Sequence, residues 1–400
     1  MSIEDELVES LSPHLRRILE AEYPRFSRPE MTRRRNAIER LLSEADVEHL
    51  VFCGHNRSGS AVQWLTQWPV TVEAVGVLSP GKPDALFVQH VNHAPLARQL
   101  ADQAELVEWG GESSIRRAIE VLQRRGARPD RVGVIGPMTF EQHEVLSARF
   151  GKIASLNRAY TKLRMVKSTE EVAWFRIGAS FSDRGMAGLR DGLRPGLTER
   201  QLGDLVERAY VADGGTNVIH FLGLTSMHNP QVAVPRQFPS QRTVQPGDVV
   251  VAEISAAFWD HPGQVLRSFT VGEDPSPLYR ELHDTAEAAF DAIAAVLKEG
   301  ATPAQVIEAS GVIEEAGFTI IDDLLHGYGG GYLPPILGCK SRPAAGPVPD
   351  EPFRAGQTVV IQPNVVTRDH KAGVQSGEMV LITKDGIESL HSFPGGFLQV

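Results

Sequence analysis

The order of helix-like and strand-like segments changes part-way along this chain of 400 residues, and that change most constrains its fold. From residue 30 to about 158, apolar segments typical of strands alternate with segments typical of helices, and Gly81-Lys-Pro-Asp84 predicts a hairpin turn. Beyond that stretch, Ser168-Thr-Glu-Glu171 and Thr198-Glu-Arg-Gln201 are capping boxes, which predict two helix starts. Helices are then expected over residues 277–298 and 303–316, with strands over 249–255, 265–271, 358–361 and 379–383.

These patterns divide the chain into three predicted segments. Residues 1–29 are expected to form a charge-rich helical extension, and residues 30–158 an α/β amino-terminal domain. Residues 159–400 are expected to form an α+β carboxy-terminal domain, because its helices group beside an antiparallel sheet. The helix that starts at Thr198 is expected to end at Gly214-Gly215.

Composition excludes several classes of protein. Acidic residues outnumber basic ones by 50 to 40, which disfavours nucleic acid as a partner. The only cysteines are Cys53 and Cys339, too few for a disulfide scaffold or a Cys-rich zinc site. No apolar run is long enough to span a membrane, and the acidic start MSIEDELVES lacks the order of a secretory signal. We therefore expect a soluble, cytoplasmic protein with no membrane partner.

Several motifs in the second half have a distinctive order and spacing. Gly247-Asp248 precedes an apolar strand that contains Glu253, Arg267 follows fourteen residues later, and His326-Gly-Tyr-Gly-Gly330 is a glycine-rich histidine loop. Together they resemble the pita-bread catalytic domain of creatinase, prolidase and aminopeptidase P. Residues 30–158 also resemble the creatinase-type amino-terminal domain. The resemblance implies a homodimer, in which Arg57 reaches the substrate of the other chain.

The metal enzymes of this family hold two divalent ions with two Asp, one His and two Glu. The resemblance places these five ligands at Glu253, Gln264, Gly330, Gln362 and Gly377. One carboxylate, two amides and two glycines cannot hold two metal ions, unless a bulge turns Glu378 inward in place of Gly377. We therefore expect no metal and no other cofactor, which argues against an Xaa-Pro metallopeptidase.

Creatinase is similar in fold and works without metal, and it moves the proton with a histidine followed by Asn-Pro. Here His228-Asn229-Pro230 resembles that motif, so His228 is the expected proton-transfer residue. Glu253 is expected to be its acidic partner or a substrate anchor, because burial in an apolar strand raises the pKa of a carboxyl group. The alternatives are that His228 caps a turn and that Glu253 forms a salt bridge with Arg267.

The remaining candidates are expected to bind substrate, and Lys340 and Arg342 are further candidates for holding its carboxylate. The glycines that follow His326 are expected to leave room for a ligand. The favoured function is a metal-independent, creatinase-like enzyme that acts on a C–N bond of a small carboxylate-bearing amidine, guanidine or amide, as a hydrolase or as a lyase or cyclase. The alternative is a catalytically silent module that binds a peptide or protein. The predicted substrate-binding residues are Gln264, Arg267, His326, Gln362, Arg57 and Glu378.

Overall fold

The structure is a computed structural model that describes residues 11–56 and 58–400. The chain divides into two compact units, which we describe separately. The smaller unit is Ala21–Arg164, and the larger comprises Met165–Val400 and the described residues before Ala21. Across the described parts of both units, every helix is too short or too polar to cross a membrane. Arg57 lies outside the described residues.

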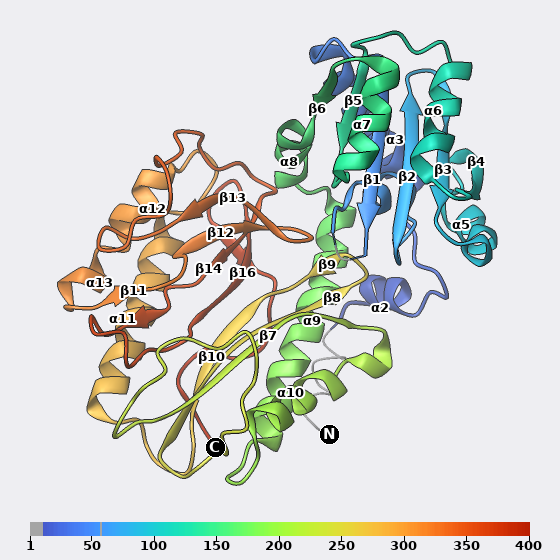
Figure 1. Ribbon diagram of the computed structural model, residues 1–400. Coiled ribbons are helices and arrows are strands. Elements are labelled where there is room, and N and C mark those ends of the chain that lie inside the picture. Colours follow the sequence, from blue (N-terminus) through green and yellow to red (C-terminus); the bar gives the residue numbers. More distant parts are fainter. Residues whose placement is uncertain (1–10, 57) are drawn as a thin grey trace. The chain divides into compact units, whose positions relative to one another are not determined.

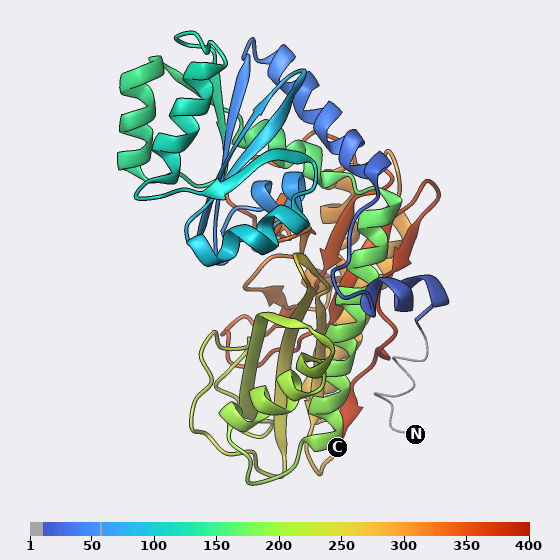
Figure 2. The same ribbon diagram turned by 90° about the vertical axis from the view of Figure 1, so that its right-hand side faces the viewer.

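The smaller unit is built on a six-stranded mixed sheet with the order β4-β3-β2-β1-β5-β6. The hairpin predicted at residues 81–84 is confirmed, since β2 and β3 pair antiparallel with Val77 opposite Ala85. Helices cover both faces of this sheet, as Figure 2 shows. The strands are β1 (His49–His55), β2 (Glu73–Ser79), β3 (Lys82–Val88), β4 (Ala104–Trp109), β5 (Val132–Ile135) and β6 (Ile153–Ser155). The helices are α3 (Arg28–Glu44), α4 (Ala61–Thr66), α5 (Ala94–Leu100), α6 (Ser114–Arg124), α7 (Phe140–Phe150) and α8 (Asn157–Met165), with a 3-10 turn, η1 (Val91–His93).

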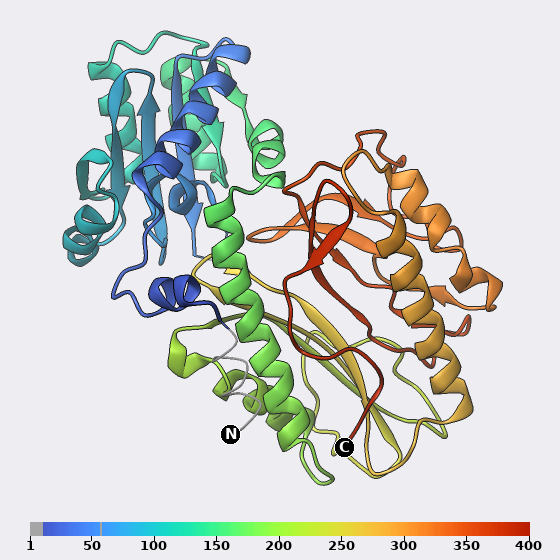
Figure 3. The same cartoon turned by 180° about the vertical axis from the view of Figure 1, so that it is seen from behind.

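The larger unit is a curved sheet with long helices on one side, seen from behind in Figure 3. Its main path runs β13-β12-β14-β16-β10-β8-β7, with β9, β17 and β18 paired at its margins and a separate pair β11-β15. Figure 1 labels most of these elements. The strands are β7 (Thr216–Ser226), β8 (Asp248–Phe258), β9 (His261–Pro262), β10 (Val265–Thr270), β11 (Thr319–Ile320), β12 (Leu325–Tyr328), β13 (Tyr332–Leu337), β14 (Thr358–Ile361), β15 (Val365–Val366), β16 (Gly377–Ile382), β17 (Ile387–Ser389) and β18 (Leu398–Gln399). The helices are α2 (Pro13–Leu19), α9 (Thr169–Gly192), α10 (Glu199–Arg208), α11 (Pro277–Val296), α12 (Pro303–Ala309) and α13 (Val312–Glu315), with a 3-10 turn, η2 (Val211–Asp213).

Both predicted capping boxes are present at the starts of the helices of the larger unit. The Ser168 hydroxyl accepts from the backbone of Glu171, whose side chain bonds back to the Ser168 N–H, and Thr198 does the same with Gln201. The end predicted for the second helix is wrong: α10 stops at Arg208, and the 3-10 turn η2 lies between it and Gly214. The single helix predicted over residues 303–316 is also wrong, because the chain turns at Ser310 and forms α12 and α13.

Candidate functional site

A buried carboxyl group and two buried amides form a hydrogen-bonded group on the sheet of the larger unit. The Gln264 Nε2 atom donates to the Glu253 Oε1 atom at 2.9 Å and to the Gln362 Oε1 atom at 3.2 Å. Gln362 donates in turn to the backbone carbonyl of Asp323 at 3.2 Å. The side chains of all three are almost completely shielded from solvent. The structure therefore brings together Glu253, Gln264 and Gln362, which the sequence analysis had singled out.

The pairing of the strands explains why these side chains meet. Glu253 lies in the middle of β8, directly opposite Leu266 of β10, so Gln264 points to the same face two residues earlier. Gln362 follows β14, and its backbone N–H donates to the Leu324 carbonyl at 3.0 Å. That bond brings the segment before β12 to the edge of the group.

Two acidic residues that were not among the predicted site residues, Asp322 and Asp323, belong to this site. Burial raises the pKa of Glu253 to about 8, and the nearby charges of Asp322 and Asp323 act in the same direction. Burial also raises the pKa of Asp322 to about 7, although its Oδ2 atom accepts from Asn364 at 2.9 Å. The signal was present in the sequence, since this acidic pair interrupts the apolar run from Phe318 to Leu325.

His326 of β12 joins the group as a neutral imidazole. Its Nδ1 atom lies 3.1 Å from the carbonyl oxygen of Gly327, so Nδ1 carries the proton. Burial lowers the pKa of His326 to about 4, against the opposing effects of Gly327 and the Gln362 side chain. The ring stacks on that of Tyr332, with centroids 3.9 Å apart, and the pKa of the Tyr332 phenol is raised by burial and then by Glu253.

The glycines around the site leave less room than expected. A Cβ atom on Gly327 would lie 2.5 Å from the Pro334 carbonyl, and one on Gly329 would meet the Lys167 side chain at 2.8 Å. Gly331 is the exception, since no atom lies within 4 Å of the corresponding position. The expected space beside His326 is therefore confined to the far end of the loop.

The donor atoms do not fit the two metal ions of the pita-bread enzymes. A Cβ atom on Gly377 would lie 2.0 Å from the Ile361 carbonyl oxygen, and Gly377 has a φ of 139°, so its backbone excludes the expected glutamate. The amides of Gln264 and Gln362 bond to one another instead of leaving two oxygens free for an ion. Within residues 11–56 and 58–400, no three His, Cys, Asp or Glu side chains are grouped so that they could hold a metal.

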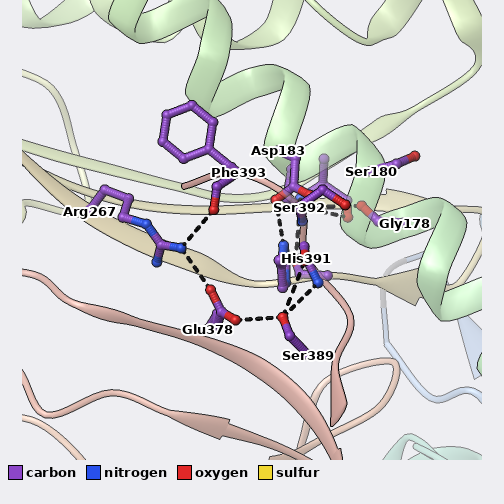
Figure 4. A network of polar contacts seen from close by, with 12 residues as sticks. Gly178, Ser180, Asp183, Arg267, Glu378, Ser389, His391, Ser392 and Phe393 are labelled. Atoms are coloured by element: carbon purple, nitrogen blue, oxygen red, sulfur yellow. Dashed lines mark hydrogen bonds and ion pairs between the residues drawn. The ribbon is translucent and has the colours of Figure 1, made fainter. Parts of the chain in front are cut away.

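Arg267 and Glu378 lie on the other face of the sheet. Arg267 is directly opposite Ala252, one residue from the Glu253–Leu266 pair, and Glu378 is opposite Val265. The buried Arg267 and the half-buried Glu378 form a salt bridge with an N–O distance of 2.7 Å. The Arg267 guanidinium also donates to backbone carbonyls, including that of Phe393 (Figure 4). The predicted salt bridge between Arg267 and Glu253 is wrong, and so is the bulge that would turn Glu378 inward.

This second group ties the end of the chain to helix α9. Ser389 donates to the Glu378 carboxylate, and the His391 ring lies 2.6 Å from the Asp183 carboxylate of α9 (Figure 4). The other Asp183 oxygen accepts from the backbone of Ser392 at 2.6 Å. Arg267 and Glu378 therefore have a structural role here and do not meet Gln264 and Gln362.

His228 is separated from Glu253. It lies in the loop after β7, exposes 67% of its side chain, and its Nε2 atom is 3.1 Å from the Glu273 carboxylate. The loop closes through the Met227 N–H, which donates to the Gly247 carbonyl, so His228 sits beside the start of β8. Glu253 is five residues further along that strand, roughly 17 Å away at about 3.3 Å per residue. The predicted pairing of His228 with Glu253 is wrong, because the loop after β7 places His228 beside Glu273 and the start of β8.

The two basic candidates differ in position. The Lys340 side chain is exposed and pairs with Glu308 on α12 at 2.7 Å. Arg342 is half-buried, and its charge lowers the pKa of Asp322 and Asp323, although burial dominates at both carboxyl groups. Of the two, Arg342 is the one placed to act on a ligand at this site.

Comparison with known proteins supports the fold. The profile described as "Metallopeptidase family M24" matches residues 173–384, more than half of the chain. A "Probable dipeptidase PepE" of Mycobacterium tuberculosis is 28% identical over 252 residues, which cover 60% of this chain and 62% of that protein. An uncharacterized hydrolase/peptidase of Sinorhizobium fredii is 24% identical over 313 residues, which cover 73% of this chain and 78% of that protein.

Solved structures agree over nearly the whole chain. An X-Pro aminopeptidase from Thermotoga maritima has a TM-score of 0.78 at 18% identity, covering 92% of this chain and 99% of the other. Dipeptidase PepE from Mycobacterium ulcerans has a TM-score of 0.76 at 22% identity, covering 94% and 99%. These matches confirm the expected pita-bread fold, with its α/β and α+β parts. The relatives named here are peptidases, and creatinase is not among them.

Proposed function

This chain belongs to metallopeptidase family M24, and we propose that it is an enzyme of that family that works without the two metal ions. The proposed reaction is cleavage of a C–N bond in a small carboxylate-bearing amidine, guanidine or amide. The hydrolase names of the relatives support the general class of reaction. The observation that carries the proposal is the hydrogen-bonded group of Glu253, Gln264 and Gln362 at positions where the resemblance expects metal ligands.

In this proposal, Glu253 replaces His228 as the proton-transfer residue. Because burial raises its pKa to about 8, Glu253 carries a proton at neutral pH and can give it to a departing nitrogen. As a water oxygen bonds to the substrate carbon and the C–N bond breaks, the departing nitrogen takes this proton, and the carboxylate so formed accepts the proton that the water loses. Gln264 fixes the carboxyl group through its 2.9 Å hydrogen bond, and a protonated carboxyl group avoids burying an uncompensated charge.

The test is a substrate panel followed by matched variants. Purified protein is incubated with carboxylate-bearing guanidines, amidines and amides and with Xaa-Pro dipeptides, each with manganese and with a chelator, and products are identified by mass spectrometry. We expect turnover of a non-dipeptide substrate that the chelator leaves unchanged. Glu253→Gln should lower kcat by about 10²- to 10⁴-fold, and the matched surface variant Glu273→Gln should leave it within a few-fold.

Each part of the proposal has an outcome that contradicts it. Xaa-Pro cleavage that depends on added manganese would show a metallopeptidase. A loss of turnover in His228→Ala comparable to that in Glu253→Gln would return the proton-transfer role to the loop histidine. Tight binding of peptides with no turnover of any compound would favour a binding module. The products also distinguish hydrolysis, which adds water, from elimination or cyclisation, which do not.

A further inference from the structure

Three buried hydrogen-bonding atoms around Glu253 lack partners. They are the Oε1 atom of Gln264, the Nε2 atom of His326 and the Oδ1 atom of Asp322, each without a hydrogen bond to any described residue. Gln264 and His326 are each 0% exposed, so open solvent does not reach these atoms directly. Proteins rarely leave buried polar atoms unsatisfied, and several such atoms in one place indicate a missing partner.

All three atoms can accept a hydrogen bond. The Gln264 amide nitrogen is already used by Glu253 and Gln362, which leaves its carbonyl oxygen. His326 holds its proton on Nδ1, which faces the Gly327 carbonyl at 3.1 Å, so Nε2 presents a lone pair. Asp322 accepts from Asn364 through Oδ2 and has Oδ1 left over. The missing partner should therefore be rich in N–H or O–H donors.

The charges of the surrounding groups favour a cation. Asp323 lies next to Asp322, and its backbone carbonyl accepts from Gln362, which links it to the Glu253 group. Arg342 is the positive side chain that acts on both aspartates, so it offsets part of this acidic character. With Glu253 protonated, Asp322 and Asp323 are two acidic groups beside one guanidinium, and a second cation would improve the balance of charge.

The aromatic pair beside these acceptors favours a planar ligand. Tyr332 stacks on His326 with an interplanar angle of 19° and exposes 47% of its surface. Asp322 and Asp323 are half-buried, so the acidic end of this group borders the solvent-exposed surface. Guanidinium and amidinium groups are planar, stack on aromatic rings, and present several N–H donors in one plane.

We propose that Gln264, His326 and Asp322 form a binding site for the amidinium or guanidinium end of a substrate. The inference rests on the proposed function for the substrate class, and it adds the residues that would recognise the cationic end. Asp322 supplies the charge-assisted hydrogen bond, while the Gln264 carbonyl and the His326 ring accept the remaining N–H groups. Arg342 is then placed to bind an anionic group of the same substrate.

Isothermal titration with matched probes tests this site without requiring turnover. Benzamidine is compared with benzamide, and methylguanidine with methylurea, because each neutral compound keeps the shape of the cation. We expect the cations to bind at least tenfold more tightly and Asp322→Asn to remove most of that preference. Asp369→Asn, which changes an exposed acid of the same unit, should leave the affinities unchanged. If Asp322→Asn fails to fold, Gln264→Met removes an acceptor at similar length and should also weaken cation binding.

The outcomes separate this inference from the proposed function. Selective cation binding that needs Asp322, in a protein with no turnover, would support the site while the proposed function fails. Turnover of a neutral amide with equal affinity for benzamidine and benzamide would overturn the site and leave the proposed function standing. Stoichiometric binding of manganese that excludes benzamidine would also overturn it, because the acceptors would then serve a metal ion. Affinities that are the same for wild type and Asp322→Asn would also overturn it, because Asp322 would then take no part in binding the cation.

Discussion

The most direct test of the site is the pH dependence of stability contributed by Glu253. Burial raises its pKa from 4.5 to about 8 in the folded protein. Between those values the folded state binds a proton that the unfolded state has lost, so stability falls as pH rises. The stabilisation that comes from this bound proton is fully present below pH 4.5. It decreases by about 1.4 kcal/mol per pH unit as the pH rises, and it is lost once the pH passes about 8.

Glu253→Gln removes this titration while keeping the shape of the side chain and its ability to accept from Gln264. The measured quantity is the free energy of unfolding of wild type minus that of the variant, from urea titrations between pH 5 and 7.5. We expect this difference to fall by about 3 kcal/mol over the 2.5 pH units, because wild type loses stability that the variant keeps. Asp322, whose pKa is also raised, is present in both proteins, so its contribution largely cancels.

The two free cysteines make the measurement specific to the larger unit. Cys339 is buried in the larger unit and Cys53 in the smaller, each at 1% exposure. A brief pulse of an aromatic disulfide reagent that reacts at acidic pH labels each thiol as its unit unfolds, and peptide mass spectrometry separates the two. The Cys53 curve reports the smaller unit: it should be the same in both proteins if the two units unfold separately, and it should shift with the Cys339 curve if they unfold together. A Cys339 difference that stays constant with pH would refute the reasoning, because Glu253 would then be ionised when folded.

Three further predictions follow from the rest of the larger unit. Arg267→Met leaves the half-buried Glu378 without its cationic partner and several buried backbone carbonyls without their donor, and it should cost about 3–5 kcal/mol. Arg176→Met, at the more exposed pair with Glu388, should cost at most about 1 kcal/mol in the same urea assay. Gly377→Glu, which restores a glutamate expected in the metal enzymes, should destabilise the protein by at least about 2 kcal/mol, because residue 377 has a φ of 139°. Elemental analysis of this variant should still find less than one metal ion per chain. A stable variant that is loaded with metal would contradict this prediction. Sedimentation should show the homodimer implied by the creatinase-type resemblance, and a monomer at micromolar concentration would count against it.

Local signals in the sequence predicted the elements better than their contacts. The capping boxes at Ser168 and Thr198 depend only on residues three positions apart, so these helix starts can be predicted from the local sequence alone. Glu253, Gln264 and Gln362 were also found, because their spacing follows strands whose pairing the family shares. The 3-10 turn after α10 could not be foreseen, since the Gly214 signal marks the end of η2 and gives no sign that the helix stops earlier.

The errors at the site concern long-range geometry. His228 carries the expected motif, but the path of its loop places it beside Glu273, and loop paths depend on packing that sequence spacing does not encode. The sequence left open a bulge that would turn Glu378 inward, whereas the register puts Gly377 opposite Leu266 and leaves Glu378 with Arg267. A shift of one residue in a strand reverses which face a side chain occupies, so this question needed the structure.

Glutamines at positions 264 and 362, where the metal enzymes are expected to have carboxylates, give a physical reason why the proposed reaction would not need a metal. In a two-metal site, converging carboxylates are tolerated because the ions cancel their charge. Without ions, a carboxylate at position 264 or 362 beside Glu253 would add a negative charge to a group already close to Asp322 and Asp323. Glutamine avoids that repulsion, and the Gln264 amide nitrogen supplies the donor that holds Glu253 at 2.9 Å. The amides therefore hold the Glu253 carboxyl group in place, while burial and the charges of Asp322 and Asp323 raise its pKa to about 8. In the proposed function, the protonated form is the one that gives a proton to the departing nitrogen.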